Sequence, residues 1–291
     1  MDAFFSRKKY LVCVDSDGCA MDTMNSKHMQ CFGPCLVEEW ELGAWREEIL
    51  DRWNRINLYA RTRGINRFKG LALMLEEIHG RYTPVAGIET LKRWIQETPA
   101  LSEDALQQYL EKEVSGQPQA DQAGITPDTE ILRKALRWSR QVNRQIQAMP
   151  QEEKHAFPGV QEGLERAGQI ADIAIVSSAN RQAVEEEWQR CGLLELVDQL
   201  MTQEQGSKSR CIHRLLEQGY DPAGVLMVGD AMGDLEAARE NGVLFYPILA
   251  GKEAASWREL IGQGLPHLEQ DSYAGVYQQQ KIREFQENFT S

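Results

Sequence analysis

Apolar residues along the chain fall into two patterns, which predict two kinds of structure. Short, almost continuous apolar runs end in a polar or acidic residue; they span 10–15, 173–177, 225–230 and 243–248. Such runs are typical of strands that are buried on both faces of a parallel sheet. Amphipathic helical patterns alternate with the later runs, over 181–190, 209–218 and 234–241. This alternation predicts a doubly wound α/β layer.

Residues 25–149 follow a different pattern. They show helical periodicity without a convincing buried strand, over 36–60, 69–79, 88–95, 102–114 and 129–149. We therefore predict an α/β core formed by residues 1–24 and 150–291, with an all-helical cap domain formed by residues 25–149. Most of the seven tryptophans lie in this insertion. We expect them to pack in its interior, because tryptophan buries a large area.

Composition narrows the choice of function. A chain of 291 residues with a net charge of -12 is unsuited to general binding of nucleic acid or anionic membranes, which needs accumulated Lys and Arg. The first residues contain no apolar stretch of signal-peptide or membrane-span length. Six cysteines in a chain of this size are typical of reduced thiols, so we expect a cytoplasmic protein. An anionic small substrate stays open, because local cations and a metal can reverse the field in one pocket.

The residues that carry chemistry stand at the carboxyl ends of the predicted strands, where ligands bind in open α/β sheets. They comprise carboxylates, a hydroxyl and an ammonium: Asp15, Asp17, Ser177, Lys208, Asp230 and Asp234. Carboxylate oxygens are the ligands that Mg²⁺ selects. A metal and Lys208 would together neutralise a phosphate group, while Ser177 would donate a hydrogen bond to its oxygens. The sequence thus predicts a site for phosphate chemistry.

These residues form four motifs that resemble those of the haloacid dehalogenase (HAD) superfamily. In order they are Asp15-Ser16-Asp17-Gly18, a strand ending in Ser177, a lone Lys208, and Gly229-Asp230 with Asp234. Each motif alone is weak, but four in order at strand ends or helix starts are specific. The resemblance covers residues 8–24 and about 155–250. It implies a Rossmann-like doubly wound parallel sheet. A helical insertion after the first motif is similar to the cap of the β-phosphoglucomutase and phosphoglycolate phosphatase branch, although the insertion looks larger than usual there.

The resemblance also implies roles for the carboxylates. Asp15 would be the nucleophile, and Asp17 would protonate the leaving oxygen and then activate water. Asp15, the backbone carbonyl of Asp17 and Asp230 would hold Mg²⁺, with Asp234 in support. Dehalogenases and phosphonatases lack an acid at the position of Asp17, so its presence favours a phosphatase or a phosphomutase.

Further residues are expected to hold the phosphoryl group and the substrate. Ser177 and Lys208 would bind the transferring group, with Ser178 equally able to donate a hydrogen bond, and Gly18 is expected beside the substrate. Cys19 departs from the Thr or Val that many related phosphatases carry there. We expect it to be a tolerated small residue and not a second nucleophile.

A basic run from Arg61 to Lys69 lies in the predicted insertion. Gly64 and Arg67 resemble a Gly and an Arg of the cap turn in β-phosphoglucomutase-like proteins. The run is either a loop with a solvated helix start or a cap loop that attracts a phosphorylated substrate. We predict that Arg67, with Lys69 as second choice, contacts the substrate.

The sequence therefore predicts a Mg²⁺-dependent phosphatase that acts on a small phosphorylated metabolite through an aspartyl-phosphate intermediate. One alternative is a phosphomutase of the β-phosphoglucomutase type, which would return the phosphoryl group to its substrate. Another is a catalytically silent binding protein with the same fold.

Overall fold

The computed structural model describes residues 8–115 and 127–289 of the chain. The chain divides into two compact units. A core unit contains residues 1–25, 59–64 and 150–291, and a helical unit contains residues 26–58 and 65–149. The grouping of residues 59–64 with the core unit was not expected from the sequence, which assigned them to the helical insertion. It brings part of the basic run into the core unit.

The core unit contains a parallel five-stranded sheet in the order β3-β2-β1-β4-β5. Its strands are β1 (Tyr10–Val14), β2 (Ala171–Val176), β3 (Gln199–Met201), β4 (Val225–Gly229) and β5 (Leu244–Pro247). The register pairs Val14 with Ile175 on one side and with Val228 on the other. The carboxyl ends of the three central strands therefore lie at one edge of the sheet. All strands except β3 are completely buried, as the continuous apolar runs predicted.

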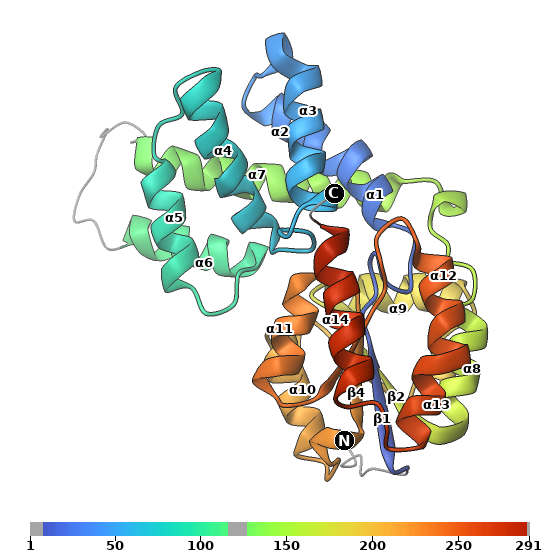
Figure 1. Ribbon diagram of the computed structural model, residues 1–291. Helices are drawn as coiled ribbons and strands as arrows, with labels where there is room; N and C mark the ends of the chain where they lie inside the picture. Colours follow the sequence, from blue (N-terminus) through green and yellow to red (C-terminus); the bar gives the residue numbers. More distant parts are fainter. Residues whose placement is uncertain (1–7, 116–126, 290–291) are drawn as a thin grey trace. The chain divides into compact units, whose positions relative to one another are not determined.

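Helices cover both faces of this sheet (Figure 1). One face packs against α8 (Val160–Ile170), α9 (Arg181–Arg190), α12 (Glu253–Glu259) and α13 (Leu265–Glu269). The other packs against α10 (Lys208–Leu216), α11 (Met232–Glu240) and α14 (Val276–Asn288). Alternate residues of β1 divide between the two faces: Val12 belongs to the first cluster, and Leu11 and Cys13 to the second. The doubly wound α/β fold predicted from the sequence is confirmed.

Residues 251–291 were predicted to belong to the core, but the sequence did not indicate their role. Three of the covering helices, α12, α13 and α14, come from this segment. Phe285 of α14 is fully buried, and its ring centroid lies 5.3 Å from that of Phe245 on β5. The hydroxyl of Tyr273 donates a hydrogen bond of 2.9 Å to the Phe245 carbonyl. The carboxyl-terminal helices therefore complete both faces of the core, with α12 and α13 on one face and α14 on the other.

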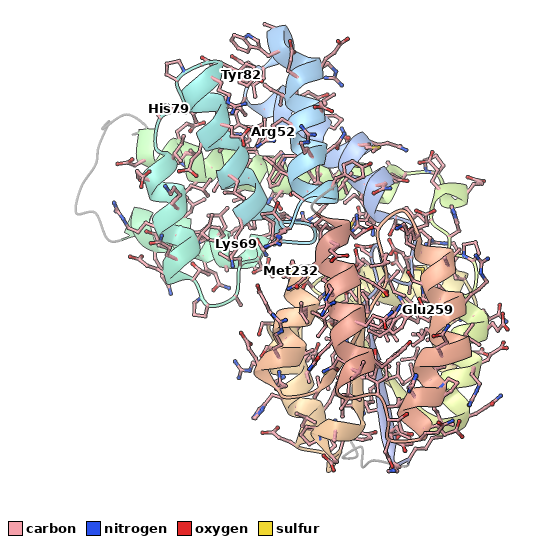
Figure 2. All side chains as sticks on the ribbon, in the orientation of Figure 1. Arg52, Lys69, His79, Tyr82, Met232 and Glu259 are labelled. Atoms are coloured by element: carbon pink, nitrogen blue, oxygen red, sulfur yellow. The ribbon has the colours of Figure 1, made fainter. Side chains whose placement is uncertain are left out.

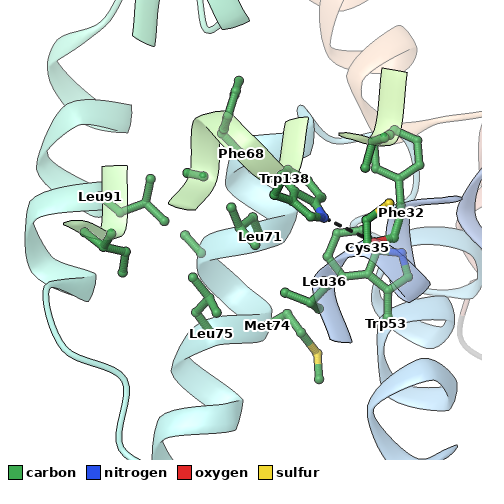
Figure 3. Packing of buried hydrophobic residues seen from close by; sticks show 14 of the residues in the cluster. Phe32, Cys35, Leu36, Trp53, Phe68, Leu71, Met74, Leu75, Leu91 and Trp138 are labelled. Carbon is green, nitrogen blue, oxygen red and sulfur yellow. Dashed lines mark hydrogen bonds between the residues drawn. The ribbon is translucent and has the colours of Figure 1, made fainter. Parts of the chain in front are cut away.

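The helical unit is built from α2 (Gly33–Glu39), α3 (Arg46–Asn54), α4 (Arg67–Arg81), α5 (Ile88–Glu97), α6 (Glu103–Ser115) and α7 (Pro127–Ala148), and the short helix α1 (Met24–Lys27) contains the point where the chain leaves the core unit. π-Helical turns span His28–Phe32 and Arg55–Tyr59. Its interior is aromatic: Trp53 and Trp138 are fully buried, and the Trp138 indole donates to the Phe32 carbonyl at 3.2 Å (Figure 3). The expected role of these tryptophans in packing is confirmed.

The continuous helix expected over residues 36–60 is interrupted. α2 ends where Glu41 takes a left-handed conformation with φ 55°, and the Leu42 amide donates to the Val37 carbonyl at 2.8 Å. This arrangement is a Schellman-type helix end, which usually uses Gly at the left-handed position. Because Glu stands at position 41 where Gly is usual, the sequence did not indicate that the helix ends here.

Among the described residues, no helix has the length and apolarity needed to cross a membrane.

Candidate active site

Asp15 and Asp230 directly follow neighbouring strands. Asp15 comes after β1, and its amide donates to the Val228 carbonyl of β4 at 3.0 Å. Asp230 comes after β4, and Asp234 lies in the first turn of the helix that begins at Met232. These three carboxylates each offer an oxygen within 4.8 Å of the others. The structure thus brings together Asp15, Asp230 and Asp234, as the sequence predicted from the strand ends.

All three carboxylates are buried, with 6% of Asp15 exposed and none of Asp230 or Asp234. Gly229 makes this approach possible. A Cβ atom at Gly229 would lie 2.4 Å from Cβ and Cγ of Asp234, closer than non-bonded atoms approach. The glycine before Asp230 is therefore required by the position of Asp234.

Lys208 is the cation shared by two of these carboxylates. Its Nζ lies 2.7 Å from Asp15 Oδ2 and 2.6 Å from Asp234 Oδ1, and its side chain is 13% exposed. Lys208 is the first residue of α10, where the Ser207 side chain caps the helix by accepting from the Arg210 amide at 3.2 Å. The structure places Lys208 where the sequence predicted it, in contact with the predicted nucleophile.

The electrostatic balance is set by burial and by these charges. Burial raises the pKa of Asp15 well above its usual range; the positive charge of Lys208 opposes this, while Asp234 and Asp230 add to it. Burial likewise raises the pKa of Asp234. For Lys208, burial lowers the pKa, but the charges of Asp15 and Asp234 outweigh it and the net shift is upward. Lys208 therefore stays protonated, and further positive charge would favour ionised carboxylates.

Arg63 is a second cation in the cluster, and sequence reasoning missed it. Its Nε donates to Asp230 Oδ2 at 2.7 Å, and the two side chains are only 3% and 1% exposed. The basic run was a usable signal, but Arg67 and Lys69 were chosen from it by resemblance. Nothing in the sequence indicated that residues 59–64 pack with the core unit.

The turn after β1 is fixed by hydrogen bonds from both sides. The Trp188 indole donates to Ser16 Oγ at 2.9 Å, and the Trp257 indole donates to the Cys19 carbonyl at 2.9 Å. Within the turn, Thr23 Oγ1 donates to Asp17 Oδ1 at 2.5 Å. Asp17 is half-buried, so the turn holds it in a defined position two residues after Asp15.

Gly18 and Cys19 complete the turn. Gly18 has φ 82°, and a Cβ there would lie 2.5 Å from Asp230 Oδ2, so its backbone passes directly beside the carboxylates. Cys19 is fully buried and its thiol donates to the Val228 carbonyl at 3.5 Å. Burial raises the pKa of this thiol well above its ordinary value. A neutral, buried thiol is a poor nucleophile, in agreement with the expectation that Cys19 is only a small residue here.

Ser177 directly follows β2, the strand that pairs with β1. It is 3% exposed, and its Oγ accepts from the Ala179 amide at 3.2 Å. Ser178, the alternative donor, is exposed. The structure thus places the Ser177 hydroxyl at the same sheet edge as Asp15 and turns Ser178 towards solvent.

Arg67 and Lys69 lie in the first turn of α4, in the helical unit. Arg67 donates to Ser139 Oγ at 3.1 Å and to Asn143 Oδ1 at 2.7 Å, and its guanidinium lies 5.0 Å from the centroid of the Phe32 ring. Lys69, which is labelled in Figure 2, is exposed. The structure therefore gives Arg67 partners within its own unit; its predicted contact with substrate stays a prediction.

The carboxylate cluster fits a divalent metal ion. Mg²⁺ takes oxygen ligands, usually from one or two carboxylates together with water. Oδ1 of Asp230 is buried and accepts no hydrogen bond from any residue that the structure describes. A buried, unpaired carboxylate oxygen is unfavourable unless a cation or donor reaches it. Asp15, Asp230 and Asp234 are thus the residues that could hold the ion.

Comparison with known proteins agrees with this picture. Residues 83–248, more than half of the chain, match the model of the haloacid dehalogenase-like hydrolase family. A phosphoglycolate phosphatase from Synechococcus elongatus is 32% identical over 132 residues, which are 44% of this chain and 59% of that protein. The match therefore spans less than two thirds of the relative's length.

Solved structures give weaker similarity. A predicted phosphatase from Clostridium acetobutylicum has a TM-score of 0.47 at 12% identity, with 82% of this chain and 84% of that chain covered. A putative β-phosphoglucomutase from Thermotoga maritima has a TM-score of 0.40 at 19% identity, with the same coverage. Similarity at this level says nothing of reaction or substrate. The family match, which includes Ser177, Lys208 and Asp230, is sufficient: the chain belongs to the haloacid dehalogenase-like hydrolase family.

Proposed function

We propose that the protein is a Mg²⁺-dependent phosphatase. It hydrolyses the phosphate monoester of a small phosphorylated metabolite through an aspartyl-phosphate intermediate on Asp15. One observation carries the proposal: the buried Asp15 carboxylate is held by Lys208 at 2.7 Å within a cluster of three carboxylates. Two further acids beside a nucleophile are suited to binding a metal, and the metal and Lys208 would offset the charge of a phosphate dianion.

The reaction has two steps. An oxygen of Asp15 attacks phosphorus, the bond from phosphorus to the ester oxygen breaks, and Asp17 gives its proton to the leaving oxygen. The Asp17 carboxylate then takes a proton from a water molecule, which attacks phosphorus. The bond between phosphorus and Asp15 breaks, inorganic phosphate leaves, and both carboxyl groups return to their starting states. The hydrogen bond from Thr23 to Asp17 supports this role, because it fixes the general acid in place.

Other residues bind the charge that moves. Lys208 neutralises phosphoryl oxygens and keeps Asp15 oriented, and the Ser177 hydroxyl donates to the phosphoryl group, with Gly18 beside it. Asp15, Asp230, Asp234 and the backbone carbonyl of Asp17 would hold Mg²⁺, which when bound supplies Lewis acidity at the phosphoryl oxygens.

A small phosphorylated acid is the first class to test, because the Synechococcus elongatus relative is named a phosphoglycolate phosphatase. We assign substrate contacts outside the phosphoryl group to the helical unit, with Arg67 and Lys69 as candidates and Ser178 in the core unit. Residues outside the reacting centre commonly set specificity in enzymes whose lid closes over the substrate.

A phosphate-release screen over a panel of phosphorylated metabolites tests the function. The panel should include phosphoglycolate, and the protein should release phosphate from its substrate in the presence of Mg²⁺. The Asp15→Asn variant should be inactive, because an amide cannot form the acyl phosphate. Isomerisation of a sugar phosphate without release would identify a phosphomutase instead. No turnover of any ester would contradict the enzymatic function.

A further inference from the structure

Arg63 forms a buried ion pair that the proposed chemistry does not use. Its guanidinium is 3% exposed, and its Nε lies 2.7 Å from Oδ2 of Asp230. Taking two charges out of water is unfavourable unless their geometry is good, so a pair at this depth has a defined position. Its acidic member is the carboxylate that follows β4, one of the three that could hold the metal.

The backbone around this pair leaves room for the guanidinium. A Cβ at Gly18 would lie 2.7 Å from an Arg63 terminal nitrogen and 2.5 Å from Asp230 Oδ2. Gly64 has φ 70°, and a Cβ there would lie 2.6 Å from the Cβ of Ala231. Gly18 therefore leaves room for the guanidinium beside Asp230, and Gly64 allows the next residue of the segment to pack against Ala231.

The ion pair between Arg63 and Asp230 changes the charge balance of the carboxylate cluster. Asp15, Asp230 and Asp234, when ionised, carry three negative charges, and Lys208 and Arg63 carry two positive charges. Lys208 contacts Asp15 and Asp234, whereas Oδ2 of Asp230 accepts a hydrogen bond from Arg63. Arg63 therefore supplies the positive charge that offsets the buried Asp230 carboxylate.

We propose that Arg63 is the counter-cation of Asp230 in the metal-free protein, and that Mg²⁺ competes with it, so that metal binding loosens residues 59–64 from the core unit. The inference rests on the metal requirement of the proposed function. A guanidinium and a divalent ion on one buried carboxylate repel each other, because charges interact strongly where water is excluded. Arg63 therefore weakens Mg²⁺ binding, and by reciprocity Mg²⁺ weakens the Arg63 ion pair by the same factor.

Calorimetric titration with Mg²⁺ measures the first half of this coupling. Arg63→Gln should bind Mg²⁺ about 10- to 100-fold more tightly than the wild type, the equivalent of about 1.4–2.8 kcal/mol, which is in the range of a hydrogen bond to a charged group. Arg63→Lys keeps the charge but loses the planar fork, so its affinity should fall between the two. The matched control is Arg61→Gln, an exposed arginine of the same segment, which should leave the affinity unchanged.

Hydrogen exchange on the wild type measures the second half and needs no variant to fold. The Arg63 amide donates to the Ala60 carbonyl at 2.9 Å, so it reports the order of the segment. Saturating Mg²⁺ should speed amide exchange in residues 59–64, although ligands usually slow exchange near their site. Slower or unchanged exchange there would overturn the proposal.

The titration separates failure of this inference from failure of the proposed function. Equal or weaker Mg²⁺ binding by Arg63→Gln would overturn the inference alone, because Arg63 would then orient Asp230 for the metal and not compete with it. Absence of Mg²⁺ binding in the wild type and in Arg63→Gln would contradict the metal requirement itself, and this inference with it.

Discussion

Replacing Lys208 by Met tests the electrostatic design of the site. The change keeps a long apolar side chain but removes the ammonium that lies 2.7 Å from Asp15 and 2.6 Å from Asp234. The two buried carboxylates then lose the cation they share. Breaking a buried ion pair lowers stability by about 3–5 kcal/mol. Since the Lys208 side chain is 13% exposed, we expect the lower end, about 3 kcal/mol in the core unit, together with loss of phosphate release.

The measurement is urea-dependent hydrogen exchange at the amides of β1 and β4, which reports the unfolding of the core unit separately from that of the helical unit. Mg²⁺ should recover more stability in Lys208→Met than in the wild type, because the ion supplies positive charge where the lysine is missing. Ligand binding at a hundredfold excess over its dissociation constant stabilises by about 2.7 kcal/mol, so the recovery is large enough to measure.

Lys281 offers a matched control. It is also a buried lysine shared by two carboxylates, at 2.6 Å from Glu259 and 2.6 Å from Glu284, and its side chain is 4% exposed. Lys281→Met should destabilise the core unit but keep phosphate release and gain no extra stability from Mg²⁺. Equal recovery by Mg²⁺ in both variants, or unchanged stability of Lys208→Met, would show that Lys208 is not the counter-cation of Asp15 and Asp234.

Three further predictions concern the metal, the packing of the carboxylates and the helical unit. EDTA should abolish phosphate release and Mg²⁺ restore it, whereas Ca²⁺ should fail to restore it, because its looser coordination misplaces Asp15; full activity with Ca²⁺ would contradict this. Gly229→Ala should destabilise the core unit by about 1–3 kcal/mol through overpacking and lower kcat, since the new Cβ would lie 2.4 Å from Asp234. Thermal unfolding measures this loss of stability, with Gly233→Ala as the control, because a Cβ added at the helical Gly233 meets no atom within 4 Å. Arg67→Ala should lower kcat/KM on the metabolite about 10- to 100-fold, the loss of a charge-assisted contact, and should spare p-nitrophenyl phosphate; equal losses on both would assign Arg67 to the internal contacts alone.

The main features of the core unit could be predicted because local pattern and burial agree there. The completely buried strands β1, β4 and β5 have no polar face, so each forms an unbroken apolar run. Strand β2 does so only after Asp172, which is why the sequence predicted its start at residue 173. Edge strand β3 has three residues, Gln199–Met201, and is half-exposed, which is too short and too mixed to give such a run. Strand ends also predicted Asp15 and Asp230, because parallel strands bring their carboxyl ends to one edge.

Arg63 could not be predicted in the same way. Its place depends on residues 59–64 packing with the core unit, a long-range event without a local periodic signal. Only the glycine at 64, with its left-handed backbone beside Ala231, marks the segment in the sequence, and a glycine in a basic run equally fits an exposed loop. The resemblance to related caps directed attention to Arg67 instead.

In the proposed mechanism the phosphoryl group passes through Asp15. The direct measurement is mass spectrometry of acid-quenched protein after reaction with acetyl phosphate and Mg²⁺. The variant Asp17→Asn should accumulate the phosphoenzyme, because this activated substrate needs no acid for its leaving group while hydrolysis still needs the base. We predict one phosphoryl group on the peptide that contains Asp15, sensitive to hydroxylamine and missing when Asp15→Asn is added. A wild-type protein that turns over acetyl phosphate while its Asp17→Asn variant carries no phosphoryl group on that peptide would contradict the mechanism.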